Sequence, residues 1–156
     1  MLRIKFLVCV LLLLHLAWLA DSVSAAESKP VRWFNDANEA WRTSQAQRRP
    51  LLIFVTRTDC VPCARMKLGT YSDRAVAATI NDRFIALTID AARPSPLLKD
   101  LAINAYPATF VISPEAVILQ RIDGFITPEQ MSAHLAKIPL AANPKPAIRT
   151  VSERAF

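Results

Sequence analysis

The chain has 156 residues, which is long enough for one domain with a sizeable hydrophobic core and too short for two ordinary domains. It carries 19 Lys and Arg against 13 Asp and Glu, a formal net charge of +6, and the basic excess is spread along the chain. Because no basic cluster is interleaved with aromatic residues, the composition argues against a nucleic-acid-binding protein.

The N-terminus has the three-part layout of a secretory signal peptide. A basic start with Arg3 and Lys5 leads into an apolar run, Phe6 to Ala20, and small or polar residues follow. We expect cleavage after Ala25, with Ala26 as the neighbouring alternative. The leader is therefore predicted to be removed, and the mature protein to be periplasmic or secreted.

An uncleaved membrane anchor is the second interpretation of this segment. The apolar run is shorter than the roughly 20 residues that a membrane-spanning helix needs, so we expect no stable membrane insertion after cleavage. Cys9 lies inside the run and is assigned no chemistry. The mature chain then has two cysteines, Cys60 and Cys63. A disulfide-stapled fold of this size would use more, so the pair is expected to be an exchange centre.

Two structural elements are predicted before the cysteines. Asn35 to Gln47 places apolar residues at helical spacing and predicts a helix that is capped by Asn35 or Asp36, with Trp41 in the core. Leu51 to Val55 is β-branched and aromatic, and it predicts a central strand that is buried on both faces.

The cysteines follow this strand across a polar turn. Pro62 is tolerated only in the first turn of a helix, so the segment predicts a strand-to-helix junction with Cys60 at the N-cap. There its sulfur faces the free N–H groups of the first turn and the positive end of the helix dipole, which favour a thiolate. Cys63 lies one turn along on the same face, close enough to form a disulfide with Cys60 and more buried. We therefore predict an exposed attacking thiol, Cys60, and a shielded resolving thiol, Cys63.

Two other interpretations of the pair are weaker. A zinc knuckle needs two further Cys or His ligands, and the chain after the leader offers only His134. A purely structural bridge between positions i and i+3 closes too short a loop to add much stability. We therefore expect redox chemistry with no metal and no dissociable cofactor.

The remaining elements follow from periodicity and capping signals. Gly69 is expected to end the cysteine helix. Ser72 to Ile80 predicts another helix or a continuation of the cysteine helix after a break. Further helices are predicted at Ser95 to Ala102 and Thr127 to Lys137, and strands at Phe84 to Asp90, Thr109 to Ser113 and Val117 to Asp123. The last two strands have hairpin spacing and should be antiparallel.

The element order indicates an α/β fold in which a mixed β-sheet is flanked by helices on both faces. Three segments follow from it: a signal peptide at residues 1–25, one domain at 26–138, and a tail at 139–156. The tail contains several prolines, so we expect it to be mobile.

This pattern resembles the thioredoxin superfamily, and the resemblance covers about Trp33 to Lys137. It is carried by the C-V-P-C of Cys60 to Cys63 after a central strand and by the Y-P-A-T-F of Tyr106 to Phe110 before a hairpin. W-F-N-D-A-N-E-A-W and C-x-x-C-x-x-M are also similar to secreted bacterial thioredoxin-like proteins. The resemblance implies a thioredoxin-like fold and a thiol:disulfide oxidoreductase that exchanges disulfides with protein substrates.

The resemblance also assigns roles to individual residues. Cys60 matches the attacking cysteine, Cys63 the resolving cysteine, and Pro107 the cis-proline that faces them. A cis bond would turn the backbone of Tyr106 outward, where its N–H and C=O could pair with an extended substrate strand. Tyr106 and Pro107 are therefore the expected substrate-binding residues. A membrane reductase that passes electrons from cytosolic thioredoxin is the suggested donor.

Three positions depart from the family pattern. Asp59 stands where the family often has tryptophan before the first cysteine. Phe54 replaces the family's buried acid on the central strand, and Ala86 replaces the usual lysine partner of that acid. These replacements remove the groups of the proton-transfer route that thioredoxin itself uses. Thiolate attack and release need only the two sulfurs.

The charges near Cys60 bear on the direction of electron flow. Arg57, Arg65 and Lys67 favour the thiolate, whereas Asp59 opposes it. These charges give a mixed signal, and the C-x-P-C insert resembles reducing members of the superfamily. We therefore expect a potential nearer to that of thioredoxin, about −270 mV, than to that of the oxidant DsbA, about −120 mV, which predicts a reductase or an isomerase-type donor.

The alternative function is that of a copper-binding chaperone with the same fold. Cys60, Cys63 and Met66 would supply the soft sulfur ligands that suit Cu(I). Met66 at this spacing is favoured as a core residue of the helix.

Overall fold

A computed structural model describes residues 29–139 together with Ser152 and Phe156. The predicted signal peptide and most of the predicted tail lie outside these residues. Across the described ranges, none of the helices has the length and apolar character needed to cross a membrane.

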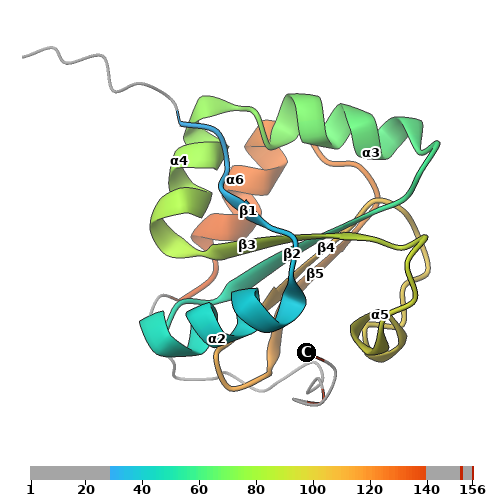
Figure 1. Cartoon of the computed structure of the whole chain (residues 1–156). Helices are drawn as coiled ribbons and strands as arrows, with labels where there is room; N and C mark the ends of the chain where they lie inside the picture. Colours follow the sequence, from blue (N-terminus) through green and yellow to red (C-terminus); the bar gives the residue numbers. More distant parts are fainter. Residues whose placement is uncertain (1–28, 140–151, 153–155) are drawn as a thin grey trace, which may run out of the picture.

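Five strands form one mixed sheet in the order β1-β3-β2-β4-β5 (Figure 1). They are β1 (Trp33–Phe34), β2 (Leu51–Thr56), β3 (Ile85–Asp90), β4 (Ala108–Ile112) and β5 (Ile118–Asp123). β3 is parallel to both β1 and β2, and β4 is antiparallel to both β2 and β5. β2 is central, and Leu51 to Val55 are all buried, which confirms the prediction from its apolar run.

Helices cover both faces of this sheet. They are α2 (Ala37–Gln47), α3 (Val61–Arg65), the π-helical turn η2 (Met66–Thr70), α4 (Arg74–Arg83), α5 (Pro96–Asp100) and α6 (Pro128–Ala136). α3, α4 and α6 lie on one face, and α2 and α5 on the other (Figure 1). Neighbouring residues of β2 alternate between the two cores, so that Phe54 packs under α3 and Ile53 packs under α2. The predicted α/β fold is therefore confirmed.

Local capping signals set several helix starts. Asp36 caps α2 by accepting a hydrogen bond of 2.7 Å from the N–H of Glu39. Asp73 caps α4, so this helix begins at Arg74, slightly later than predicted. Thr127 and Gln130 form the predicted capping box of α6, with hydrogen bonds in both directions.

Two features differ from the sequence-based predictions. Gly69 does not end the cysteine helix, because the helix continues past it by widening into the π turn η2, and Gly69 has no left-handed backbone. β1 was not predicted, since Trp33 and Phe34 are too few for an alternating pattern. It forms through pairing with Ala86 and Leu87 of β3.

Ser152 and Phe156 near the C-terminus contact the domain. The ring of Phe156 stacks on Trp41, with centroids 4.3 Å apart and planes at 10°. The N–H of Ser152 donates to Asp100 Oδ2 at 3.3 Å. Trp41 is only 6% exposed, which confirms it as a core residue. The predicted mobility of the tail falls on residues outside the described part of the chain.

Candidate functional site

The two cysteines lie at the outgoing end of the central strand β2. Cys60 has an extended backbone and is the N-cap of α3, and Pro62 stands in the first turn. Asp59 has a φ of 57°, a left-handed conformation that Asp adopts more readily than most residues. The turn at Asp59 therefore leads from β2 into the helix that carries both sulfurs.

Cys60 and Cys63 form a disulfide with their Cα atoms 5.2 Å apart. Cys63 is 2% exposed and belongs to the core, whereas Cys60 is half-buried. The N–H of Cys63 donates to Cys60 Sγ at 3.3 Å, since the intervening Pro62 has no N–H to offer. The predicted capping position and difference in burial are confirmed. The attacking and resolving roles stay predictions.

The Tyr106-Pro107 peptide bond is cis and lies at the same end of the sheet as the disulfide. Ala108 pairs with Val55 in the antiparallel register, so Pro107 lies opposite the end of β2, where the loop to Cys60 begins. Pro107 is buried and Tyr106 is half-buried. The structure thus brings the predicted substrate-binding residues and the cysteine loop to one end of the sheet.

The core beneath α3 is aromatic where the family's acid would stand. Phe54 is 1% exposed, and its ring centroid lies 4.9 Å from that of Tyr71 and 5.9 Å from that of Trp33. The hydroxyls of Tyr71 and Thr109 share a buried hydrogen bond of 2.7 Å. Burial raises the pKa of Tyr71 well above its ordinary value, and the bond to Thr109 offsets this only in part. Tyr71 therefore stays neutral.

Sequence reasoning missed the pair formed by Tyr71 and Thr109. The two residues are 38 positions apart and belong to no shared motif, so no spacing signal could have connected them. None of the buried side chains in the described ranges is a carboxylate. The two hydroxyls are thus among the few polar groups in this core.

Met66 follows the cysteines in the helix and is fully buried. Its side chain belongs to the core on the α3 side of the sheet, which confirms the core interpretation. Within residues 29–139, 152 and 156, no group of three or more His, Cys, Asp or Glu could hold a metal ion. The groups that the structure gathers at this end of the sheet are those of thiol chemistry.

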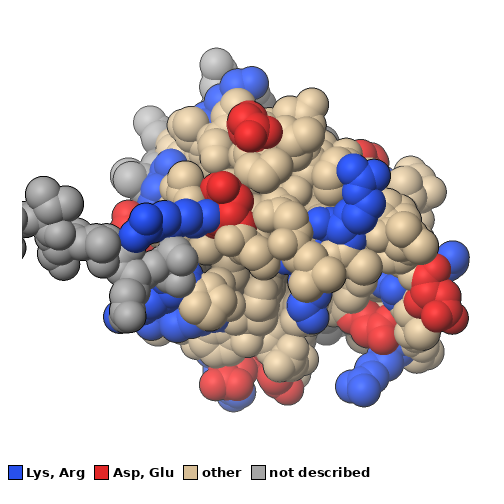
Figure 2. Space-filling view, turned by 90° about the horizontal axis from the view of Figure 1, so that it is seen from above, with Lys and Arg blue, Asp and Glu red and all other residues tan. Residues whose placement is uncertain are grey.

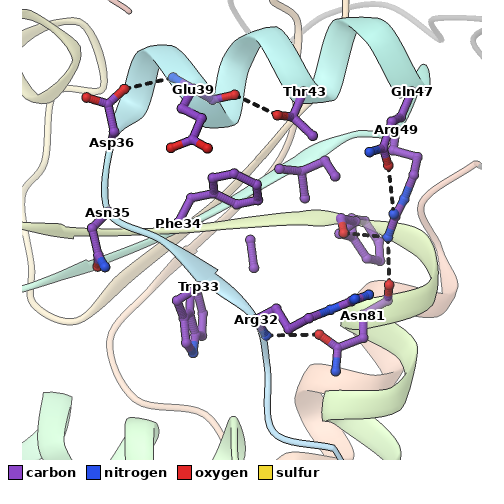
Figure 3. A pocket seen from close by; sticks show the side chains of 13 residues that line it. Arg32, Trp33, Phe34, Asn35, Asp36, Glu39, Thr43, Gln47, Arg49 and Asn81 are labelled. Carbon is purple, nitrogen blue, oxygen red and sulfur yellow. Dashed lines mark hydrogen bonds between the residues drawn. The ribbon is translucent and has the colours of Figure 1, made fainter.

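A hollow of about 760 Å³ lies along α2 and β1 (Figure 3). Its polar side chains are largely engaged within the protein. The guanidinium of Arg49 donates to the carbonyls of Asn81 and Phe84 at 2.8 and 2.7 Å, and Asn81 Oδ1 accepts from the N–H of Arg32. These bonds tie β1 and α4 to the start of β2. Neither cysteine lines the hollow, and its polar groups are largely engaged within the protein. We therefore place the candidate site at the disulfide and not in the hollow.

Comparisons with known proteins agree with this geometry. A family model described as Thioredoxin-like matches residues 32–114. The fold is similar to that of a thioredoxin from Thermus thermophilus, with a TM-score of 0.64 and 20% identity over 70% of this chain and 87% of that one. It is also similar to a DsbH oxidoreductase, with a TM-score of 0.61 and 16% identity over 76% of this chain and 88% of that one.

A third similar structure is the C-terminal domain of DsbD from Neisseria meningitidis in the reduced form. It has a TM-score of 0.55 and 18% identity over 64% of this chain and 91% of that one. A search of the curated proteins found no match. At these identities the structural likeness establishes the fold, and the chemistry has to be argued from the site itself.

Proposed function

This chain belongs to the thioredoxin-like family, and from that premise we propose that it is a periplasmic or secreted thiol:disulfide oxidoreductase that reduces disulfides of protein substrates. The observation that carries the proposal is a disulfide between a half-buried cysteine at a helix N-cap and a cysteine buried behind it. The N-terminal signal pattern supports the location. Asp59, which opposes the Cys60 thiolate, and the similarity of the C-V-P-C centre to reducing members of the superfamily support a reducing direction. The reaction requires no dissociable cofactor.

The proposed reaction begins with the reduced protein. The Cys60 thiolate attacks one sulfur of a substrate disulfide, that S–S bond breaks, and the other substrate sulfur leaves as a thiolate. Cys63, once deprotonated, attacks Cys60 Sγ, re-forms the Cys60–Cys63 bond and releases the second substrate sulfur. Two electrons pass to the substrate. A dithiol donor must then reduce the pair, and a membrane reductase is the partner that we propose.

The local geometry favours Cys60 as the attacking sulfur. It is the more exposed of the two, and its Sγ already accepts the N–H of Cys63 at the start of the helix. The same N–H and the positive end of the helix dipole would stabilise a thiolate there. Cys63 is enclosed by the core, so a large substrate cannot reach it before the mixed disulfide forms.

The substrate chain is proposed to lie beside Tyr106. This residue precedes β4 at the end of the sheet that holds the disulfide, and in the described ranges it takes part in none of the backbone hydrogen bonds of the loops and turns. Its N–H and C=O can therefore pair with an extended segment, as an added strand would.

Insulin reduction tests the activity. The wild-type protein should accelerate precipitation of the insulin B chain by dithiothreitol, whereas Cys60→Ser and Cys63→Ser should fall to the rate of dithiothreitol alone. Alkylation of the reduced protein at neutral pH should label Cys60 first, and preferential labelling of Cys63 would reverse the two roles.

Equilibration with a glutathione buffer tests the direction. A reduction potential of about −270 mV for the Cys60–Cys63 pair supports a reductant, and one above about −150 mV would make the protein an oxidant. Expression of Cys63→Ser with its own leader should trap substrates as mixed disulfides, while a variant that lacks both cysteines traps none. N-terminal sequencing of that material tests the predicted cleavage after Ala25.

A further inference from the structure

The surface around the disulfide carries groups that the exchange chemistry does not require. Val61 and Leu68 are 72% and 77% exposed, and they are the exposed large hydrophobic residues of the described ranges. Val61 lies between the two cysteines, and Leu68 follows in η2, the continuation of the same helix. An apolar contact surface therefore adjoins Cys60.

Three cationic side chains border this apolar surface. Arg57 lies on the loop before Cys60, and Arg65 and Lys67 lie on α3 and η2. All three are exposed, and none forms an ion pair with any residue in the described part of the chain. We call Arg57, Arg65 and Lys67 the basic rim.

Two members of the basic rim are held in place by aromatic rings. The guanidinium carbon of Arg57 lies 5.2 Å from the ring centroid of Tyr106, and that of Arg65 lies 4.4 Å from the ring centroid of Phe125. A guanidinium stacked on a ring keeps its N–H edge free, and this edge matches a carboxylate in two parallel hydrogen bonds. Because stacking already restricts these side chains, binding a carboxylate loses less conformational entropy.

The acidic groups nearby do not neutralise the basic rim. Asp59 is exposed on the same loop and opposes it in part. Asp73 is engaged in capping α4, and Glu129 lies in the first turn of α6. Figure 2 looks onto the α3 side of the molecule and shows Lys and Arg side chains set apart from one another, with uncharged surface and some acidic side chains between them. Such spacing suits separate carboxylates on a folded or extended protein segment better than the continuous phosphates of a nucleic acid.

We propose that the basic rim selects protein substrates in which acidic and apolar residues flank the reacting cysteine. Apolar side chains of the substrate would cover Val61 and Leu68, and carboxylates would bind the guanidinium groups of Arg57 and Arg65. This inference rests on the proposed function, because it states which disulfides the site reduces fastest.

Single-turnover kinetics with two synthetic substrates test the inference. Pre-reduced protein, which itself supplies the two electrons, is mixed with one of two fluorogenic peptides that contain a disulfide. In both peptides an apolar residue stands next to the cysteine. The residues on either side of this pair are Glu in one peptide and Lys in the other. At low ionic strength the acidic peptide should react about tenfold faster, and added salt should shrink the ratio towards one. The ratio is the readout because any change in thiol reactivity scales both rate constants alike.

Matched charge reversals assign the preference to the basic rim. Arg65→Glu should lower the ratio, and the triple variant Arg57→Glu, Arg65→Glu, Lys67→Glu should bring it to one or below. Arg42→Glu makes the same change of charge as Arg65→Glu, at an exposed position of α2 on the opposite face, and should leave the ratio unchanged. All four positions are exposed, so these variants should fold.

Each outcome bears on the two proposals differently. Equal rates for the two peptides with the wild-type protein, or a ratio that survives in the triple variant, overturn the selectivity and leave the reductase standing. Failure to reduce either peptide or insulin overturns both. Loss of the ratio in Arg42→Glu would show that overall charge, and not the basic rim, sets the preference.

Discussion

The two cores on either side of the sheet are built from the same strands but differ in chemistry. The core under α3, α4 and α6 contains Cys63 and the hydroxyl pair of Tyr71 and Thr109. The core under α2 and α5 is formed mainly by aliphatic and aromatic side chains, with the buried hydroxyl of Ser44 bonded to the carbonyl of Arg49. Adjacent residues of β2, Phe54 and Ile53, face these two environments. The comparison indicates that redox chemistry belongs to one face, while the other face contributes mainly stability.

The strongest test of this division is loss of the attacking sulfur. Cys60→Ser should reduce insulin no faster than dithiothreitol alone, because no mixed disulfide can form. The free energy of unfolding in urea, compared with that of the reduced wild-type protein, should change little, since Cys60 is only half-buried. Retained turnover in this variant would remove Cys60 from the mechanism.

The opposite result is expected on the α2 side. Ile53→Ala deletes methyl groups from a fully buried position and should lower the free energy of unfolding by about 2–5 kcal/mol. Urea titration measures this loss. Insulin reduction per folded molecule should remain near the wild-type rate. If that rate falls as strongly as in Cys60→Ser, the two cores are coupled and the division is wrong.

The hydroxyl pair of Tyr71 and Thr109 tests the polar character of the core under α3, α4 and α6. Tyr71→Phe leaves Thr109 Oγ1 without its partner in the core and should lower the free energy of unfolding by about 1–3 kcal/mol. Adding Thr109→Val should restore part of the loss, because both polar groups are then absent. A double-mutant cycle in urea measures this coupling, and additive effects would show that the bond contributes nothing.

Tyr71 also predicts a pH dependence. Its pKa is raised in the folded state, mainly by burial, so the unfolded chain loses this proton first as the pH rises. The contribution to stability is intact below the unfolded value, about 10, and declines above it. Wild-type stability should therefore fall more steeply than that of Tyr71→Phe at alkaline pH. Parallel curves for the two proteins would contradict this assignment.

The smallest expected effect is at the start of α6. A hydrogen bond from Thr127 is the main cause that lowers the pKa of Glu129. Thr127→Ala should bring that pKa back towards its ordinary value and lower the free energy of unfolding by about 1 kcal/mol through loss of the N-cap. NMR titration of Glu129 measures the first effect. Thr127→Ser, which keeps the hydroxyl, should retain the lowered pKa of Glu129 and the wild-type free energy of unfolding.

The sequence by itself determined the position of the disulfide and the order of most elements. A buried strand, a polar turn and Cys60-Val-Pro-Cys63 specify the junction, because capping, the missing N–H of Pro62 and apolar periodicity act within a few residues. The cis bond before Pro107 was predicted from family resemblance and is present in the structure. These features depend on nearest neighbours or on a recognisable motif.

Only the tertiary structure decided the contacts between distant segments. The bond between Tyr71 and Thr109, the stacking of Arg57 on Tyr106 and the pairing of β1 with β3 each join parts of the chain that no local pattern connects. The π turn at Gly69 likewise depends on how the helix packs on the sheet, since glycine in the sequence predicted an end there. Such features arise from burial and packing, whose free energies depend on all the neighbours that the fold brings together.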